Sequence, residues 1–247
     1  MALAAVRSQL APSGVLRAAV NLSNILLVTG KSSSGEPQGV APDMAREIAG
    51  QLGVPLQIIP FAHPDKLCEA AASSSWDISL VGADPDRAAH IDFTAAYCEI
   101  QVTCLLPQSS GLRSLAELDV PGTRIAVKGG GAYDLWLSRN LKHAQLVRAD
   151  TLDTSYDVFH ADSLEALAGL RPKLLSELEK HPGSYRLMDA HFMAVQQAVG
   201  CLKCSDGSRA GIDFLREFVA RSKASGLVQG LLERHGVNGG LSVAGAE

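Results

Sequence analysis

The chain has 247 residues, of which 47% are hydrophobic and 19% charged, and its formal net charge is −4. This hydrophobic fraction supports a packed core and excludes a largely disordered chain. The nearly balanced charge lacks the basic stripe of a nucleic-acid-binding protein, and no apolar run approaches the roughly 18 residues that a membrane-spanning helix needs.

The N-terminal segment does not have the pattern of a secretion signal. Arg7, Ser8 and Gln9 interrupt its apolar residues almost at once, whereas a signal needs roughly 7–15 apolar residues in a row. We therefore expect a cytoplasmic protein from the sequence as written, or a periplasmic one if Met1 is an added start residue. Residues 2–10 are predicted to form a short helix.

Apolar strands alternate with amphipathic helices in the first part of the chain. The predicted strands are residues 15–20, 56–61 and 76–81, and the predicted helices are 40–52 and 64–73. The helix at 40–52 carries an apolar residue at every fourth position and ends at Gly53, a glycine typical of helix C-termini. This β-α-β-α-β order predicts a parallel sheet with right-handed crossovers.

The alternation then repeats, which predicts a second α/β unit. A strand at 99–106 precedes it, and the further predicted strands are 123–127, 144–148, 164–168, 185–188 and 191–199. The predicted helices are 114–118, one after Gly131, a short one capped by Asp153 or Thr154, and 172–180. Two helices ended by Gly226 and Gly236 follow, and the small polar tail at 238–247 is expected to fray.

The five cysteines do not indicate a disulfide framework, because their number is odd and the chain is long. They fit a reducing compartment better than an oxidising one. Cys201 and Cys204 form a Cys-x-x-Cys motif, a weak indication of zinc to which Cys98 and Cys104 could add two thiolates. The alternative is that all are free thiols in or near a core.

Four stretches of the chain carry a family resemblance. They are Gly35-Glu-Pro-Gln-Gly-Val-Ala-Pro-Asp43 with the helix ending Gln51-Leu-Gly53; Trp76-Asp77-Ile78; Asp84-Pro-Asp-Arg87 with Ile91-Asp-Phe-Thr-Ala-Ala-Tyr97; and Lys223-Ala-Ser-Gly226 with Leu232-Glu-Arg-His-Gly236. Together they resemble the bacterial extracellular solute-binding proteins of polar amino-acid ABC transporters, over essentially residues 15–236.

This resemblance implies a two-lobed α/β fold of the type II periplasmic-binding-protein kind, in which each lobe is a sheet flanked by helices and two hinge strands join the lobes. Lobe 1 would comprise residues 1–106 plus 193–247, and lobe 2 residues 107–192. The resemblance also implies a monomer without a cofactor. Such a protein binds a small-molecule carboxylate between its lobes, closes by hinge bending and delivers the ligand to an ABC-transporter permease.

Arg87 is the first candidate ligand-binding residue. In the family an arginine at this place pairs with the carboxylate of the ligand, for which a planar guanidinium is well suited. The alternative is a surface arginine paired with Asp84, Asp86 or Asp92. Gly82 occupies the preceding place where the family has a hydroxyl residue.

Three successive glycines, residues 129–131, precede a predicted helix whose N-terminal N–H groups favour an anion. The matching family segment has hydroxyl side chains where this chain has Gly131 and Ala132, so the backbone donors are kept and the side-chain donors are lost. Lys128 and Tyr133, on either side of the glycines, are further candidates.

The acidic residue that holds a ligand ammonium group in this family is missing. Leu170 stands at its place in the second lobe, and Asn21 stands after the first strand, where an acid can also occur. Because a buried ammonium without an acceptor costs several kcal/mol, we expect a small carboxylate, such as a dicarboxylate or an amide-bearing acid, rather than an ordinary α-amino acid. Asp162 or Glu165 could supply the missing acid.

An enzyme on the same fold, such as a cyclohexadienyl-dehydratase-like lyase or isomerase, is the alternative function, and a cytosolic ligand sensor is a third. The general acid of such an enzyme would be His63, Lys66, Lys128 or Glu165. The small aromatic content, 5% of the chain, fits a small polar ligand. The candidate ligand-binding residues are Asn21, Asn24, Lys66, Gly82, Arg87, Lys128, Gly130, Gly131, Ala132 and Tyr133.

Overall fold

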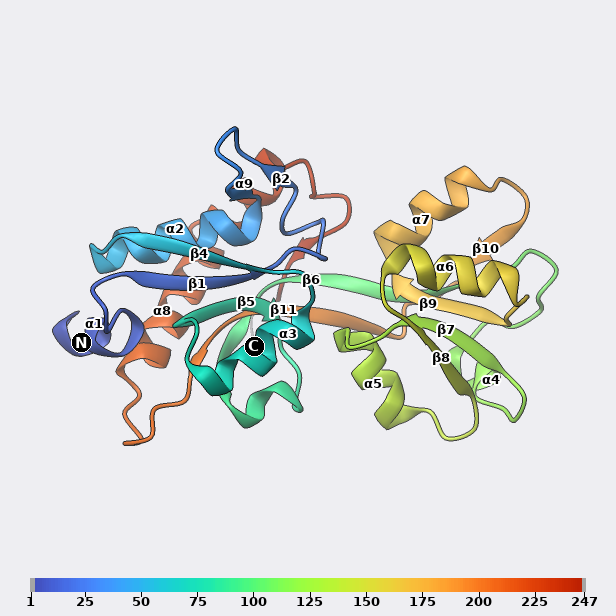
Figure 1. Ribbon diagram of the computed structural model, residues 1–247. Helices are drawn as coiled ribbons and strands as arrows, with labels where there is room; N and C mark the ends of the chain where they lie inside the picture. Colours follow the sequence, from blue (N-terminus) through green and yellow to red (C-terminus); the bar gives the residue numbers. More distant parts are fainter. Residues whose placement is uncertain (1–2, 246–247) are drawn as a thin grey trace. The chain divides into compact units, whose positions relative to one another are not determined.

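The computed structural model describes residues 3–245 as a mixed α/β chain (Figure 1). The chain divides into two compact units: unit 1 consists of Met1–Glu99 and Gln196–Glu247, and unit 2 of Ile100–Val195. It passes from one unit to the other twice, within β6 (Ile91–Pro107) and within β11 (Met193–Leu202). The lobe limits implied by the family resemblance lie slightly further into unit 2 on both strands, and they stay a prediction.

Unit 1 is built on a sheet in the strand order β4-β1-β5-β11-β6. Its first three strands in the chain are β1 (Leu16–Asn21), β4 (Leu56–Phe61) and β5 (Ile78–Gly82). β1 lies between the other two and pairs in parallel with both, as the strand–helix alternation predicts. β11 then pairs antiparallel with β5.

The helices of unit 1 pack their apolar faces against this sheet and against one another. Its other elements are α1 (Leu3–Leu10), α2 (Val40–Leu52), α3 (Pro64–Glu69), α8 (Ala210–Ala224), α9 (Leu227–Arg234), the 3₁₀ turns η1 (Ala70–Ser73) and η2 (Arg87–Ala89), and the short strands β2 (Gly30–Lys31), β3 (Pro37–Gln38) and β12 (Ser242–Val243). Helix α2 confirms its prediction: Met44, Ile48 and Leu52 are fully buried. Gly53 ends α2 in the left-handed conformation, with φ of 62°, which a glycine adopts without strain.

Three predictions for unit 1 are corrected by the structure. The segment predicted as one helix at 64–73 is α-helical only to Glu69 and continues as a 3₁₀ turn. The strand predicted to begin at Glu99 begins at Ile91. The tail predicted to fray contains β12, which pairs with Cys98 and Glu99 of β6. This tail is anchored because Leu241, beside β12, is only 4% exposed.

Unit 2 repeats the same arrangement in the strand order β6-β9-β7-β8, with β10 also paired to β6. Its remaining elements are α4 (Leu115–Leu118), β7 (Arg124–Lys128), α5 (Ala132–Asn140), β8 (Gln145–Ala149), α6 (Leu152–Ala161), β9 (Ala166–Leu170), α7 (Arg171–Lys180) and β10 (Tyr185–Leu187). β7 lies between β8 and β9 and is parallel to both, whereas β9 is antiparallel to β6. Helix α6 is capped by Thr151, not by Asp153 or Thr154, and Thr154 completes a capping box with it.

The sheet of unit 2 is buried on both faces. Ile125 and Val127 of β7 belong to a cluster with Leu137 of α5, whereas Ala126 between them belongs to a cluster with Phe159 of α6 and Leu174 of α7. Because side chains alternate along a strand, α5 covers one face of the sheet and α6 and α7 cover the other. None of the helices within residues 3–245 is both long and apolar enough to cross a membrane.

An ion pair joins β1 to the start of β5 in unit 1. Asp77, with only 3% of its side chain exposed, lies 2.6 Å from Nη2 of Arg17. The Asp77 carboxylate also accepts the backbone N–H of Arg17 at 2.8 Å, and the Asp77 N–H donates to the carbonyl of Arg17 at 2.9 Å. The pair therefore fixes where β5 starts relative to β1.

We expect Asp77→Asn to lower the free energy of unfolding by about 2 kcal/mol, because the Arg17 guanidinium loses its anion in a partly buried setting. Urea denaturation followed by circular dichroism measures this. Glu69→Gln is the matched control, since that carboxylate pairs with Lys66 on an exposed helix face and we expect its loss to have no measurable effect. Equal effects of the two substitutions would contradict the assignment.

Candidate functional site

The ends of the parallel strands bring the candidate residues of unit 1 together. β1, β4 and β5 are parallel neighbours, so their carboxyl ends lie at one edge of the sheet. Ligands of α/β proteins bind at such edges. Asn21 ends β1, His63 follows β4, and Gly82 ends β5 five residues before Arg87. We call this edge the carboxyl edge of unit 1.

Arg87 is held rigidly at this edge. Only 7% of it is exposed, and its Nη1 donates a hydrogen bond to the carbonyl oxygen of Gly82 at 2.6 Å. Burial lowers the pKa of Arg87 from its ordinary value, and the neighbouring Cys68 and Asp84 oppose that shift. Arg87 is therefore not a solvent-exposed surface arginine. A buried guanidinium at a strand end suits an incoming carboxylate.

Helix α3 brings four polar residues to the same edge. His63 is its N-cap residue, and the Nδ1 atom of His63 and the Oδ1 atom of Asp65 are buried without a hydrogen-bond partner among the described residues. Burial raises the pKa of the Cys68 thiol, and Arg87 opposes that effect. Lys66 is different, because it is exposed and bonds Glu69 at 2.8 Å.

The two asparagines after β1 shape the loop that they occupy. The side-chain oxygen of Asn21 accepts from the N–H and the hydroxyl of Ser23, at 3.1 and 2.8 Å. The side-chain oxygen of Asn24 accepts from the N–H of Leu26 at 3.3 Å. Their amide oxygens are thus already used locally, which leaves the amide N–H groups as the donors that a ligand could use.

In unit 2 the glycine triplet forms the turn between β7 and α5. Gly130 adopts a φ of 70° and donates its N–H to Oδ2 of Asp134 at 2.9 Å, and Gly131 is the N-cap residue of α5. Asp134 also accepts from Nε of Arg148 at 3.0 Å. Asp134, in the first turn of α5, therefore already uses the Gly130 N–H and places a negative charge near the positive end of this helix.

The residues on either side of these glycines are buried. Lys128, which ends β7, is 4% exposed, and Ala132 and Tyr133 are 7% and 4% exposed. The hydroxyl of Tyr133 has no hydrogen-bond partner among the described residues, and burial raises the pKa of this tyrosine. The carboxyl end of β7 in unit 2 therefore has backbone N–H donors and the buried ammonium group of Lys128.

Leu170 lies at the carboxyl end of β9, at the same edge of the unit 2 sheet as the glycine turn. It is the last residue of β9 and the N-cap residue of α7, and β9 is aligned with β7 by the pairs Ile125–Ala166 and Ala126–Leu167. Asp162, after α6, and Glu165, before β9, lie at the other end of the strand. Neither acid is therefore brought to the edge where Leu170 stands.

Glu165 is committed to an ion pair. Its Oε1 lies 2.8 Å from Nη2 of Arg124, and its Oε2 accepts the backbone N–H of Arg124 at 2.7 Å. The hydrogen bond from Arg124 lowers the pKa of Glu165. A general acid needs a raised pKa, so this environment does not suit the enzymatic role considered for Glu165.

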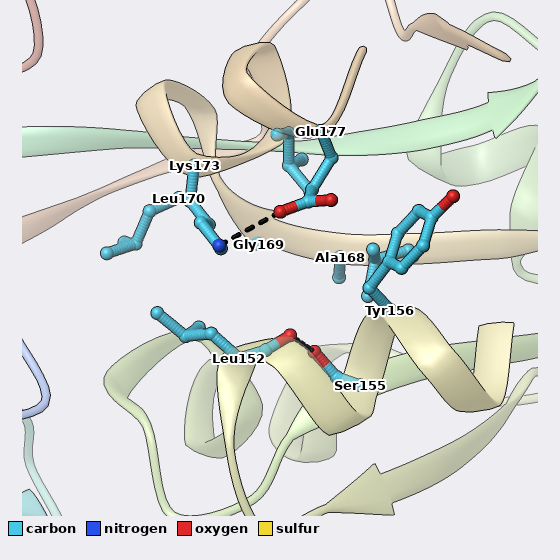
Figure 2. Close-up of a pocket in the computed structure, with 10 residues that line it drawn as sticks. Leu152, Ser155, Tyr156, Ala168, Gly169, Leu170, Lys173 and Glu177 are labelled. Atoms are coloured by element: carbon cyan, nitrogen blue, oxygen red, sulfur yellow. Dashed lines mark hydrogen bonds and ion pairs between the residues drawn. The ribbon is translucent and has the colours of Figure 1, made fainter. Parts of the chain in front are cut away.

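A pocket of unit 2 lies between α6 and α7, beside the end of β9 (Figure 2). Lys173 bridges Asp153 at 2.8 Å and the buried Glu177 at 2.9 Å. Burial lowers the pKa of Lys173, but its hydrogen bonds to these two carboxylates outweigh that effect and raise it. The cavity measures about 10 Å³, which is room for about one water molecule. It is too small for an amino acid.

The cysteines give no support to a metal site. All five are free thiols, and Cys201 is buried within β11 while Cys204 is half-buried. Cys98 belongs to unit 1 and Cys104 to unit 2. Within residues 3–245, no group of three or more His, Cys, Asp or Glu side chains is placed to hold a metal ion.

Comparison with known proteins agrees with this architecture. The model of the bacterial extracellular solute-binding proteins, family 3, matches residues 27–238. The chain belongs to this family. Among solved structures, a putative ABC-transporter binding component of Wolinella succinogenes, complexed with lysine, superposes with a TM-score of 0.73 at 22% identity, over 90% of this chain and 95% of that one. Its two-lobed periplasmic-binding-protein fold confirms the predicted fold class.

Two further relatives of this solute-binding protein connect the family to an enzyme. Cyclohexadienyl dehydratase of Pseudomonas aeruginosa is 27% identical over 184 residues, which are 69% of this chain and 68% of that protein. An ancestral amino-acid-binding protein, a precursor of cyclohexadienyl dehydratase, superposes with a TM-score of 0.72 at 18% identity, over 94% of this chain and 97% of that one.

The Arg124–Glu165 pair predicts a pH-dependent contribution to stability. Because the pKa of Glu165 is lowered, the pair stabilises the fold above the ordinary glutamate pKa, and this contribution is lost as the pH falls through the lowered value. We expect Glu165→Gln to be slightly less stable than the parent at pH 7 and to approach it below about pH 4. Urea denaturation at several pH values tests this, and a pH-independent difference would contradict it.

Proposed function

We propose that this solute-binding protein captures a small carboxylate-bearing solute, amino-acid-like or an organic acid, for an ABC-transporter permease. The observation that carries this proposal is the burial of Arg87, with its Nη1 fixed by the carbonyl of Gly82 at the carboxyl edge of unit 1. A guanidinium held in this way needs little reorganisation to form a bidentate pair with a carboxylate. The lysine bound to the Wolinella succinogenes relative is such a carboxylate.

The glycine turn of unit 2 supports the same class of solute. The first turn of α5, after Gly131, contains backbone N–H groups that a carboxylate can accept from, and the neighbouring Lys128 adds a positive charge that offsets Asp134 of the same turn. We propose that Arg87 is the main partner of this solute. We further propose that the protein acts as a monomer.

Replacing Arg87 tests the site directly. We expect Arg87→Ala to weaken the binding of the best ligand by about 100-fold or more, because a carboxylate loses a charge-assisted bidentate partner worth about 3 kcal/mol. A thermal-shift screen of amino acids, keto acids and dicarboxylates finds the ligand, and calorimetry measures its affinity.

Arg216→Ala is the matched control, because Arg216 is a half-exposed surface arginine of the same unit that pairs with Asp213. This control is expected to bind like the parent. Unchanged affinity in Arg87→Ala would show that the site lies elsewhere.

A lyase or isomerase is the second candidate, supported by the 27% identity to cyclohexadienyl dehydratase. Of the acids considered for it, Lys66 is paired on the surface and Glu165 is paired at the other end of the sheet of unit 2. His63, whose buried Nδ1 has no hydrogen-bond partner among the described residues, is the candidate acid in unit 1, and the buried Lys128 is the candidate in unit 2. Incubation of the protein with prephenate and with each screen hit, followed by chromatography, decides between the two functions, because a receptor returns its ligand unchanged.

The cellular location gives an independent test of the two functions. A receptor that serves an ABC permease is proposed to work outside the cytoplasmic membrane, whereas an enzyme can act in the cytoplasm. Fractionation of the native host with an antibody against this protein separates the alternatives. A purely cytoplasmic pool would count against the transport function.

A further inference from the structure

The start of α3 contains two buried polar atoms that the fold itself does not use. The Oδ1 atom of Asp65 and the Nδ1 atom of His63 have no hydrogen-bond partner among the described residues. Buried polar atoms are nearly always hydrogen-bonded in native proteins, so two such atoms within three residues require an explanation. A functional role, or a water or ion bound at the site, is such an explanation.

These atoms lie at the edge where Arg87 lies. α3 follows β4 and Arg87 follows β5, and both strands run parallel to β1 between them. Asp65 interacts electrostatically with the Arg87 guanidinium and with the thiol of Cys68. Asp65 is thus a carboxylate near the proposed carboxylate-binding group.

The other acids near Arg87 and Cys68 already have partners. Oδ1 of Asp84 accepts the N–H of Asp86 at 2.9 Å, Asp86 is itself engaged, and Glu69, near Cys68, is bonded by Lys66 at 2.8 Å. The neighbouring lysine is therefore engaged by Glu69, on the exposed side of α3, rather than by Asp65. Asp65 is the acid of this group with a buried oxygen still able to accept a hydrogen bond.

We propose that Oδ1 of Asp65 accepts a hydrogen bond from a cationic N–H group of the solute whose carboxylate pairs with Arg87. The inference rests on the proposed function of Arg87. Asp65 would supply in unit 1 the acceptor that the family has in the second lobe, where this chain has Leu170. This assignment reverses the expectation drawn from Leu170, because a solute with both charges, such as an amino acid, then finds both partners.

Matched ligand pairs test the assignment. L-Alanine and pyruvate, L-glutamate and 2-oxoglutarate, and L-phenylalanine and phenylpyruvate each share a carboxylate and a side chain, and differ in having or lacking the ammonium group. Calorimetry with the full chain measures each pair on the parent, on Asp65→Asn and on Glu69→Gln, the control on the exposed side of the same helix.

The parent is expected to bind the amino acid of the best pair at least about tenfold more tightly than its 2-oxo acid. Asp65→Asn is expected to lose about tenfold or more in affinity for the amino acid and to bind the 2-oxo acid as the parent does, and Glu69→Gln to change neither. A parent that binds both members equally, or an Asp65→Asn variant that binds the amino acid as the parent does, overturns the inference.

A failure of the proposed function would give a different result from a failure of the Asp65 assignment. If Arg87→Ala binds both members of the pair like the parent, the carboxylate site itself is wrong. If Arg87→Ala loses both members while Asp65→Asn loses neither, the carboxylate site stands and Asp65 is only a helix-terminal acid. The comparison of amino and 2-oxo acids on the parent protein needs no variant, so equal binding of the two overturns the inference even if a substitution disturbs folding.

Discussion

Each unit has one charged clamp that ties its central parallel strand to the start of a neighbouring strand. In unit 1 the clamp is Arg17 with Asp77, and in unit 2 it is Arg124 with Glu165. In both clamps, the carboxylate accepts hydrogen bonds from the guanidinium and from the backbone N–H of the same arginine. The same chemistry therefore sets the strand register in the two units, although the residues are 60 apart in one and 41 apart in the other.

The clamps lie at the amino ends of the strands, and the strand register that they set also determines which residues lie together at the carboxyl ends. With β1 and β5 in register, the chain leaves β5 at Gly82 and turns at once into the short segment that holds Arg87. With β7 and β9 in register, the glycine turn and Leu170 come to one edge. A structural ion pair and a proposed binding residue are thus separated by the length of one strand, and the first helps to determine where the second stands.

Much of the fold could be predicted from the sequence, because helix and strand periodicities are local. Helix α2 is an example, with its apolar face and its terminal glycine. The start of β6 at Ile91 could not be predicted from the sequence. The pairing of β12 could not be predicted either, because β12 pairs with Glu99 from the far end of the chain and its two residues carry no periodic pattern. The sequence leaves Glu165 as a candidate general acid because its arginine partner is distant in the chain, whereas Arg87 is predicted from the family motif. Asp65 carried no signal, because an acid in a first helical turn is ordinary.

The two crossings of the chain, within β6 and β11, also fix an order of assembly. Unit 2 is one continuous segment, whereas unit 1 combines residues from both ends of the chain. During synthesis the whole of unit 2 emerges before the unit 1 part of β11, α8 and α9 exist. Unit 1 until then has β5 without its antiparallel neighbour, which exposes a strand edge and apolar surface. During synthesis, the half that holds Arg87 can therefore be completed only after the segment that forms unit 2 has emerged.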